Sequence, residues 1–128
     1  MRLATLKSGQ LAVIRDDRAL PLSELGFAGT MLELIHESPS LNDLPPGEDG
    51  VPFRSEDLAA PLENPSKIVA IGLNYVEHAS ETKLELPKTA LVFAKFPNAL
   101  TGPADPIRIP EGITQQVDYE VELGVVMG

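Results

Sequence analysis

The chain has 128 residues, a net charge of −9, 43% hydrophobic residues and no cysteine. The negative charge argues against nucleic acid and anionic membranes as partners, because both bind basic surfaces. No apolar run approaches the roughly 20 residues of a membrane helix. The absence of cysteine excludes disulfides, thiolate zinc sites and a cysteine nucleophile. We therefore expect a globular protein, located in the cytoplasm.

The first part of the chain is predicted to be a small antiparallel sheet. Residues 3–6 and 10–14 read as two strands on either side of the turn Lys7-Ser8-Gly9, which predicts a hairpin. The pair Asp16-Asp17 then turns the chain into a third short strand near residues 19–22. This pattern predicts a small β-rich N-terminal domain.

A helix and a proline-rich stretch are expected to follow. The sequence from Thr30 to Glu33 is a capping-box pattern, and it predicts a helix with Met31, Leu34 and Ile35 on one face. His36 lies on the same helix and is predicted to be a surface residue. Residues 37–66 are rich in proline and predicted to be irregular, with a turn of helix at 55–59. We expect a domain boundary here, between domains 1–64 and 65–128.

The second half is predicted to contain strands near residues 67–72, 89–95, 107–109 and 117–127. After Gly72, Asn74 is expected to cap a helical turn over residues 75–81. His78 and Glu81 would then be i,i+3 neighbours, so that the carboxylate could orient the imidazole. Such a pair could deprotonate a water molecule. A surface His–Glu pair without a chemical role is the simpler alternative.

Residues 117–127 show the alternation of a strand, with apolar and acidic residues facing opposite sides. The acidic face would cost stability by repulsion between like charges, unless a hard cation bound there. Carboxylates two residues apart lie roughly 6.5–7 Å apart at Cα, which allows convergence on one ion. A solvated acidic edge strand is the alternative. The expected core face is Tyr119, Val121, Leu123 and Val125, and the acidic face is Asp118, Glu120 and Glu122.

Lys95 ends an apolar strand and would share a face with Phe93. A lysine on a buried face needs an anionic partner. A carboxylate or enolate oxygen of a substrate would serve, although an isolated lysine is usually exposed.

The motifs of the second half resemble those of the fumarylacetoacetate hydrolase family, from about Pro65 to the end of the chain. The part before Pro65 resembles the small, variable N-terminal region of bacterial-type members. The motifs that carry the resemblance are Ile71-Gly72-Leu73-Asn74-Tyr75, His78-x-x-Glu81, Pro87, Val92-Phe93-Ala94-Lys95, Leu100-Thr101-Gly102-Pro103, Ile107-x-Ile109-Pro110 and residues 118–128.

The resemblance implies a mainly β protein with short helices (α+β). A small N-terminal domain would precede the first part of a mixed β-sandwich roll, which we expect to be incomplete at Gly128. It implies Mg²⁺ or Mn²⁺ bound by Glu120 and Glu122, with a third ligand, an Asp, beyond Gly128. His78 and Glu81 would be the catalytic dyad, with Lys95 near the active site.

The implied activity is hydrolysis of a C–C bond in a 1,3-diketo acid of acylpyruvate or fumarylpyruvate type, through a metal-bound enolate. Isomerisation or decarboxylation of a related 2-oxo acid in aromatic catabolism, and a non-catalytic fragment, remain alternatives. The missing C-terminal part of the fold is expected to come from the same protein or from a second chain, and completed units are expected to pair into homodimers.

Overall fold

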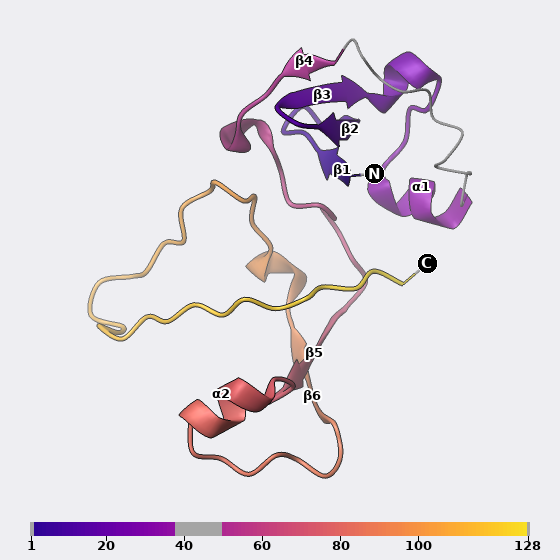
Figure 1. The fold of residues 1–128 in the computed structure, drawn as a ribbon. Helices are drawn as coiled ribbons and strands as arrows, with labels where there is room; N and C mark the ends of the chain where they lie inside the picture. Colours follow the sequence, from indigo (N-terminus) through magenta and orange to yellow (C-terminus); the bar gives the residue numbers. More distant parts are fainter. Residues whose placement is uncertain (1, 38–49, 128) are drawn as a thin grey trace. The chain divides into compact units, whose positions relative to one another are not determined.

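The computed structural model describes residues 2–37 and 50–127 (Figure 1). The chain forms two compact units. The first contains the residues up to Leu62 and those from Thr101 onward, and the second spans Glu63–Leu100. This division by compactness is no test of the predicted domains 1–64 and 65–128, which stay a prediction. Residues 38–49 of the predicted proline-rich stretch lie outside the described residues.

A four-stranded antiparallel sheet in the order β1-β2-β3-β4 builds the first unit. Residues Lys7 to Gly9 form the turn between β1 and β2, and Asp16-Asp17 the turn between β2 and β3, so both predicted hairpins are confirmed. The strand β4, which pairs with β3, was not predicted. The bounds are β1 (Arg2–Thr5), β2 (Leu11–Arg15), β3 (Arg18–Pro21) and β4 (Val51–Pro52).

The core of this unit lies on both faces of β2, whose residues 11–14 are all buried. On one face Leu11 and Val13 pack with Leu22 of the short 3₁₀ helix η1 (Leu22–Leu25) and with Leu34 of α1 (Met31–Glu37). The other face is smaller and is formed by Ala12, Ile14 and Ala19, with Phe53 packed against them.

The capping box predicted for α1 is present. The Thr30 amide donates to Glu33 Oε2 at 2.7 Å, and the Glu33 amide donates to Thr30 Oγ1 at 3.3 Å. The Thr30 hydroxyl also donates to Glu33 Oε2, at 2.9 Å. The bonds from the Thr30 amide and hydroxyl hold the pKa of the Glu33 carboxyl below its ordinary value, because the charged form is the better acceptor. Leu34 is buried and His36 is exposed, as the sequence predicts.

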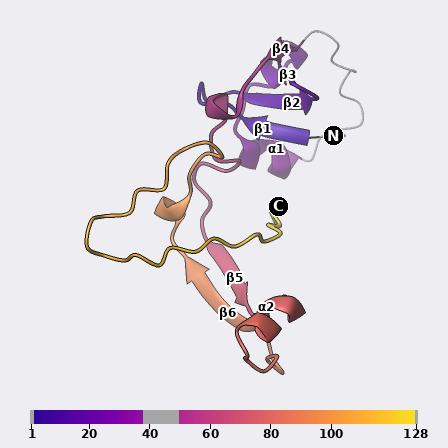
Figure 2. The same ribbon diagram turned by 60° about the vertical axis from the view of Figure 1, so that its left-hand side comes forward.

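The second unit is an antiparallel hairpin of β5 (Ile68–Gly72) and β6 (Leu91–Lys95), with α2 (Val76–Glu81) between them in the chain (Figure 2). The 3₁₀ turn η4 (Pro97–Ala99) follows β6. Both strands and the helix are confirmed. The capping prediction is wrong, because the N-cap of α2 is Tyr75 in an extended conformation, without a side-chain hydrogen bond to the helix.

Residues 107–109 and 117–127 form no strand among the described residues, contrary to the prediction. A strand requires a neighbour that completes its backbone ladder, and no described segment forms one with either stretch. The expected core face of 117–127 is therefore exposed. Its four side chains are 74–86% accessible, namely Tyr119, Val121, Leu123 and Val125.

The observed elements make the chain mainly β with short helices, as predicted. None of the helices in the described ranges has the length and apolar character required to cross a bilayer.

Candidate functional site

The helix α2 presents the predicted dyad and is held between two left-handed residues. Leu73, which joins β5 to the helix, has φ +52°, and Lys83, just after the helix, has φ +57°. Such a conformation costs a residue with a Cβ about 1–2 kcal/mol. Among the described residues only Asp16 shares this feature outside glycine. Left-handed residues of this kind are often found at functional sites, so both ends of α2 are of interest.

The C-terminal end of α2 is a Schellman motif. The Leu84 amide donates to the Ala79 carbonyl at 2.9 Å, and the Lys83 amide donates to the Ser80 carbonyl at 3.2 Å. The Thr82 hydroxyl also donates to the His78 carbonyl at 2.8 Å. The backbone that carries His78 is therefore fixed from its C-terminal side.

His78 and Glu81 lie on α2 with the predicted i,i+3 spacing. His78 is half-buried, the neighbouring Ala79 is buried, and Glu81 is exposed. A histidine that is partly enclosed yet accessible can exchange a proton with a bound molecule, and a carboxylate one turn away can orient its ring. Their catalytic roles stay a prediction.

Lys95 occupies the other end of the hairpin. It pairs with Ile68, whereas Gly72, which leads towards α2, pairs with Leu91. The two ends lie four positions apart along the strand, which corresponds to about 13 Å. The prediction of a buried face at this position is wrong, because Lys95 is exposed and Phe93 is 47% accessible. A two-stranded sheet has no second layer to cover that face. The role of Lys95 near the active site stays a prediction.

The predicted metal ligands Glu120 and Glu122 belong to the other compact unit. Both are exposed in a stretch without regular structure. Two carboxylates are a suitable donor type for Mg²⁺ or Mn²⁺. However, no group of three His, Cys, Asp or Glu side chains among residues 2–37 and 50–127 is placed to hold a metal ion. The neighbouring Asp118 accepts a hydrogen bond at 2.8 Å from the Tyr119 amide. The donor type thus fits a divalent cation, and the donor set in the described ranges is incomplete.

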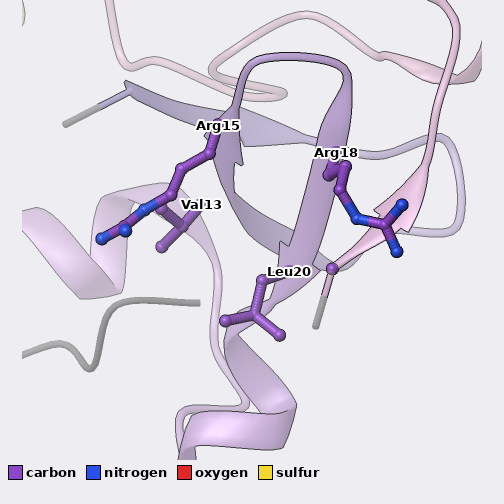
Figure 3. A pocket seen from close by; sticks show the side chains of 5 residues that line it. Val13, Arg15, Arg18 and Leu20 are labelled. Carbon is purple, nitrogen blue, oxygen red and sulfur yellow. The ribbon is translucent and has the colours of Figure 1, made fainter. Parts of the chain in front are cut away.

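The described pockets contain none of the predicted site residues. One is a shallow depression over Val13, Leu20 and Gly50, flanked by Arg15 and Arg18 (Figure 3). These two arginines face each other in the β2–β3 register, but their side chains extend in different directions. They are therefore not arranged to hold a single anion between them.

The left-handed residues Leu73 and Lys83 were missed by the sequence reasoning. Glycine is the usual signal for that conformation, and neither position carries it. The structure brings His78 and Glu81 onto one helix and Lys95 onto the same hairpin unit.

The fold and these motifs define a class of protein. Residues 67–128 match the family model described as fumarylacetoacetate (FAA) hydrolase C-terminal. This part of the chain is therefore similar to the fumarylacetoacetate hydrolase family, whose members generally use divalent metal ions.

The chain is also similar to relatives with assigned names. It is 51% identical over 71 residues to a Xenopus laevis protein named oxaloacetate tautomerase fahd2, mitochondrial, covering 56% of this chain and 22% of the relative. It is 44% identical over 76 residues to the Homo sapiens protein named oxaloacetate tautomerase FAHD2A, mitochondrial, covering 59% and 24%. The chain thus spans about a quarter of the length of these relatives.

The fold also resembles a crystal structure of a Mycobacterium smegmatis protein described as HpcE. The TM-score is 0.65 and the sequence identity 27%, over 88% of this chain and 42% of that one. The similarity therefore extends into the N-terminal part of the chain, and it corresponds to part of a larger fold.

Proposed function

We propose that this chain contributes to a metal-dependent enzyme that interconverts the keto and enol forms of a 2-oxo acid, of the oxaloacetate type. The observation that carries the proposal is the similarity of 71 to 76 residues of this chain to relatives named oxaloacetate tautomerases. Tautomerisation is favoured over the hydrolysis that the sequence suggested, because these relatives are named for it.

The residues of α2 suit this chemistry. Keto–enol conversion removes one proton from the carbon next to the carbonyl and places one proton on the carbonyl oxygen, without a net change in composition. An imidazole can take up and return a proton near neutral pH. In the proposal the half-buried His78 moves the proton, and the exposed Glu81, one turn along α2, orients the ring.

Glu120 and Glu122 are the residues of this chain that would hold the ion, together with at least one further ligand. When bound, Mg²⁺ or Mn²⁺ supplies Lewis-acid polarisation of the substrate carbonyl. Both side chains are carboxylates, two residues apart in the sequence, and both are exposed to solvent.

The proton-transfer role is tested by following the absorbance of enol oxaloacetate in the presence of Mg²⁺ or Mn²⁺. His78→Ala is expected to lower the rate by roughly 10²–10⁴, the usual contribution of a general base. His36→Ala is the matched control, since His36 is an exposed histidine on α1, and it should leave the rate unchanged. An undiminished rate in His78→Ala would show that this histidine does not transfer the proton.

The metal role is tested separately by Mn²⁺ titration calorimetry. We expect weak binding by this chain alone, tight binding when the rest of the fold is present, and loss of binding in Glu122→Ala. Glu111→Ala removes an exposed carboxylate outside the Glu-x-Glu pair and is the control. Undiminished binding in Glu122→Ala contradicts the ligand assignment.

A second candidate is hydrolysis of a C–C bond in an acylpyruvate or fumarylpyruvate. The i,i+3 placement of His78 and Glu81 on one helix favours it, since this pair could deprotonate water for attack on the distal carbonyl. Loss of acylpyruvate absorbance would reveal this reaction, and release of CO₂ would reveal decarboxylation. If none of these reactions occurs with metal bound, the chain is a non-catalytic member.

We further propose that the remaining part of the catalytic fold, in the same protein or in a second chain, completes the site and that completed units form homodimers. The partial coverage of the relatives and of the similar structure supports this. Light scattering after size-exclusion chromatography is the test. A cooperatively melting monomer at 13.7 kDa would contradict the proposal.

A further inference from the structure

The turn at residues 102–105 is closed by one of its own side chains. The Gly102 amide donates to Asp105 Oδ2 at 3.0 Å, and the Asp105 amide donates to the Gly102 carbonyl at 3.2 Å. Asp105 therefore ties the turn together through both its backbone and its carboxylate, some 15 residues before Glu120.

The same carboxylate reaches the N-terminal sheet. Lys7 Nζ donates to Asp105 Oδ1 at 2.7 Å, and both side chains are partly exposed. The hydrogen bonds from Lys7 and Gly102 hold the pKa of Asp105 below its ordinary value. Lys7 precedes the family segment by 60 residues, so the ion pair joins the N-terminal part of the chain to that segment.

Close packing adds a second, independent contact between the N-terminal part of the chain and the turn at 102–105. Gly102 is buried, and a Cβ placed on it would lie 2.8 Å from the Leu58 carbonyl oxygen and 2.7 Å from Asp105 Oδ2. Real Cβ atoms do not approach other atoms this closely. The turn therefore packs directly against the backbone at Leu58, and position 102 has no room for a side chain.

The backbone at Leu58 is in turn bound to β1. Leu6 and Leu58 form an antiparallel bridge, and the Lys7 amide donates to the Asp57 carbonyl at 2.9 Å. Ala59 donates its amide to the Thr5 carbonyl at 2.8 Å. The surface that receives the turn is therefore an extension of the N-terminal sheet.

We propose that the N-terminal sheet is a clamp for the turn at 102–105, closed by the Lys7–Asp105 pair and by the close packing of Gly102 against the Leu58 backbone. This assigns a role to the part of the chain that precedes the family segment: it fixes the point from which the chain continues towards Glu120 and Glu122. Pro103 within the turn and Pro106 directly after it restrict the backbone. The clamp does not depend on which reaction the protein catalyses.

Amide hydrogen exchange of the 128-residue chain, followed by NMR at Gly102 and Asp105, tests the clamp. Lys7→Met should accelerate exchange at both amides about two- to fivefold, as expected for an exposed ion pair. Lys7→Arg should restore most of the protection. Gly102→Ala should accelerate exchange at Asp105 by about fivefold or more, because it overfills a closed site.

Two variants serve as matched controls and should change exchange at the turn less than about twofold, as for ordinary surface changes. Gly124→Ala adds a methyl group where no heavy atom lies within 4 Å, and Lys88→Met removes an exposed lysine of the other unit.

Unchanged exchange at Gly102 and Asp105 in Lys7→Met overturns the clamp, whatever the effect of Gly102→Ala. Acceleration that extends equally to the β5–β6 amides also overturns it, since this would indicate general destabilisation. Acceleration confined to the turn and to the amides of Lys7 and Ala59 supports the clamp.

Discussion

Replacing Lys83 by glycine is expected to stabilise the helix that carries His78. Lys83 is the left-handed residue of the Schellman motif that ends α2, with φ +57°. Glycine is the usual residue there, because it has no Cβ to clash with the following carbonyl oxygen. The structure therefore predicts a gain in stability from a substitution that removes an exposed side chain.

The magnitude is the difference between two effects. Relief of the left-handed conformation contributes about 1–2 kcal/mol. The greater freedom of glycine in the unfolded chain opposes this by about 0.4–1 kcal/mol. The net stabilisation is about 0.5–1 kcal/mol, which corresponds to roughly a two- to fivefold smaller opening equilibrium of the last helical turn.

Hydrogen exchange at the Thr82 and Leu84 amides measures this change, since both donate across the end of the helix. Lys88→Gly is the matched control, because Lys88 is an exposed lysine without a positive φ, and it should stabilise nothing. Equal or faster exchange in Lys83→Gly than in the wild type would refute the reasoning.

Three further results are expected in the first unit. Thr5→Val should cost about 1–2 kcal/mol in urea unfolding, because the buried Thr5 hydroxyl donates to the Pro61 carbonyl at 2.8 Å and valine leaves that acceptor unsatisfied. Gly50→Ala should cost about 1–3 kcal/mol in the same assay, since a Cβ there would lie 2.9 Å from the backbone of Ala19. The pKa of Asp105 is lowered in the folded state, so its stabilisation is fully present above its ordinary pKa of 3.8 and is lost as pH falls through the folded pKa. The stability difference between the wild type and Asp105→Asn should therefore shrink as the pH falls below 3.8, and a difference that does not shrink would contradict this.

Local signals in the sequence account for most of what could be predicted. The hairpins, the capping box of α1 and the strands β5 and β6 each depend on residues close together in the chain. In contrast, β4 has only two residues, one of them Pro52, and it pairs with β3 more than 30 residues away. No local pattern signals such a strand.

The site was predictable only in part. The spacing of His78 and Glu81 depended on one helix, which is present. The strand over 117–127 was inferred from alternation, but alternation describes the side chains and not the neighbour that a strand needs. The contact between Lys7 and Asp105 joins residues 98 positions apart and had no sequence signature. The cytoplasmic location and the absence of nucleic acid and membrane partners stay predictions.

The unequal burial of the two sheets affects how the chain would melt. β2 is enclosed on both faces, whereas every residue of β6 is exposed and its sheet has only two strands. Isolated two-stranded hairpins are marginally stable in water. Heating should therefore open β5–β6 well before β1–β3, and limited proteolysis should cut first between α2 and β6. Calorimetry of this chain would then record two overlapping transitions, and a single Tm would describe neither sheet.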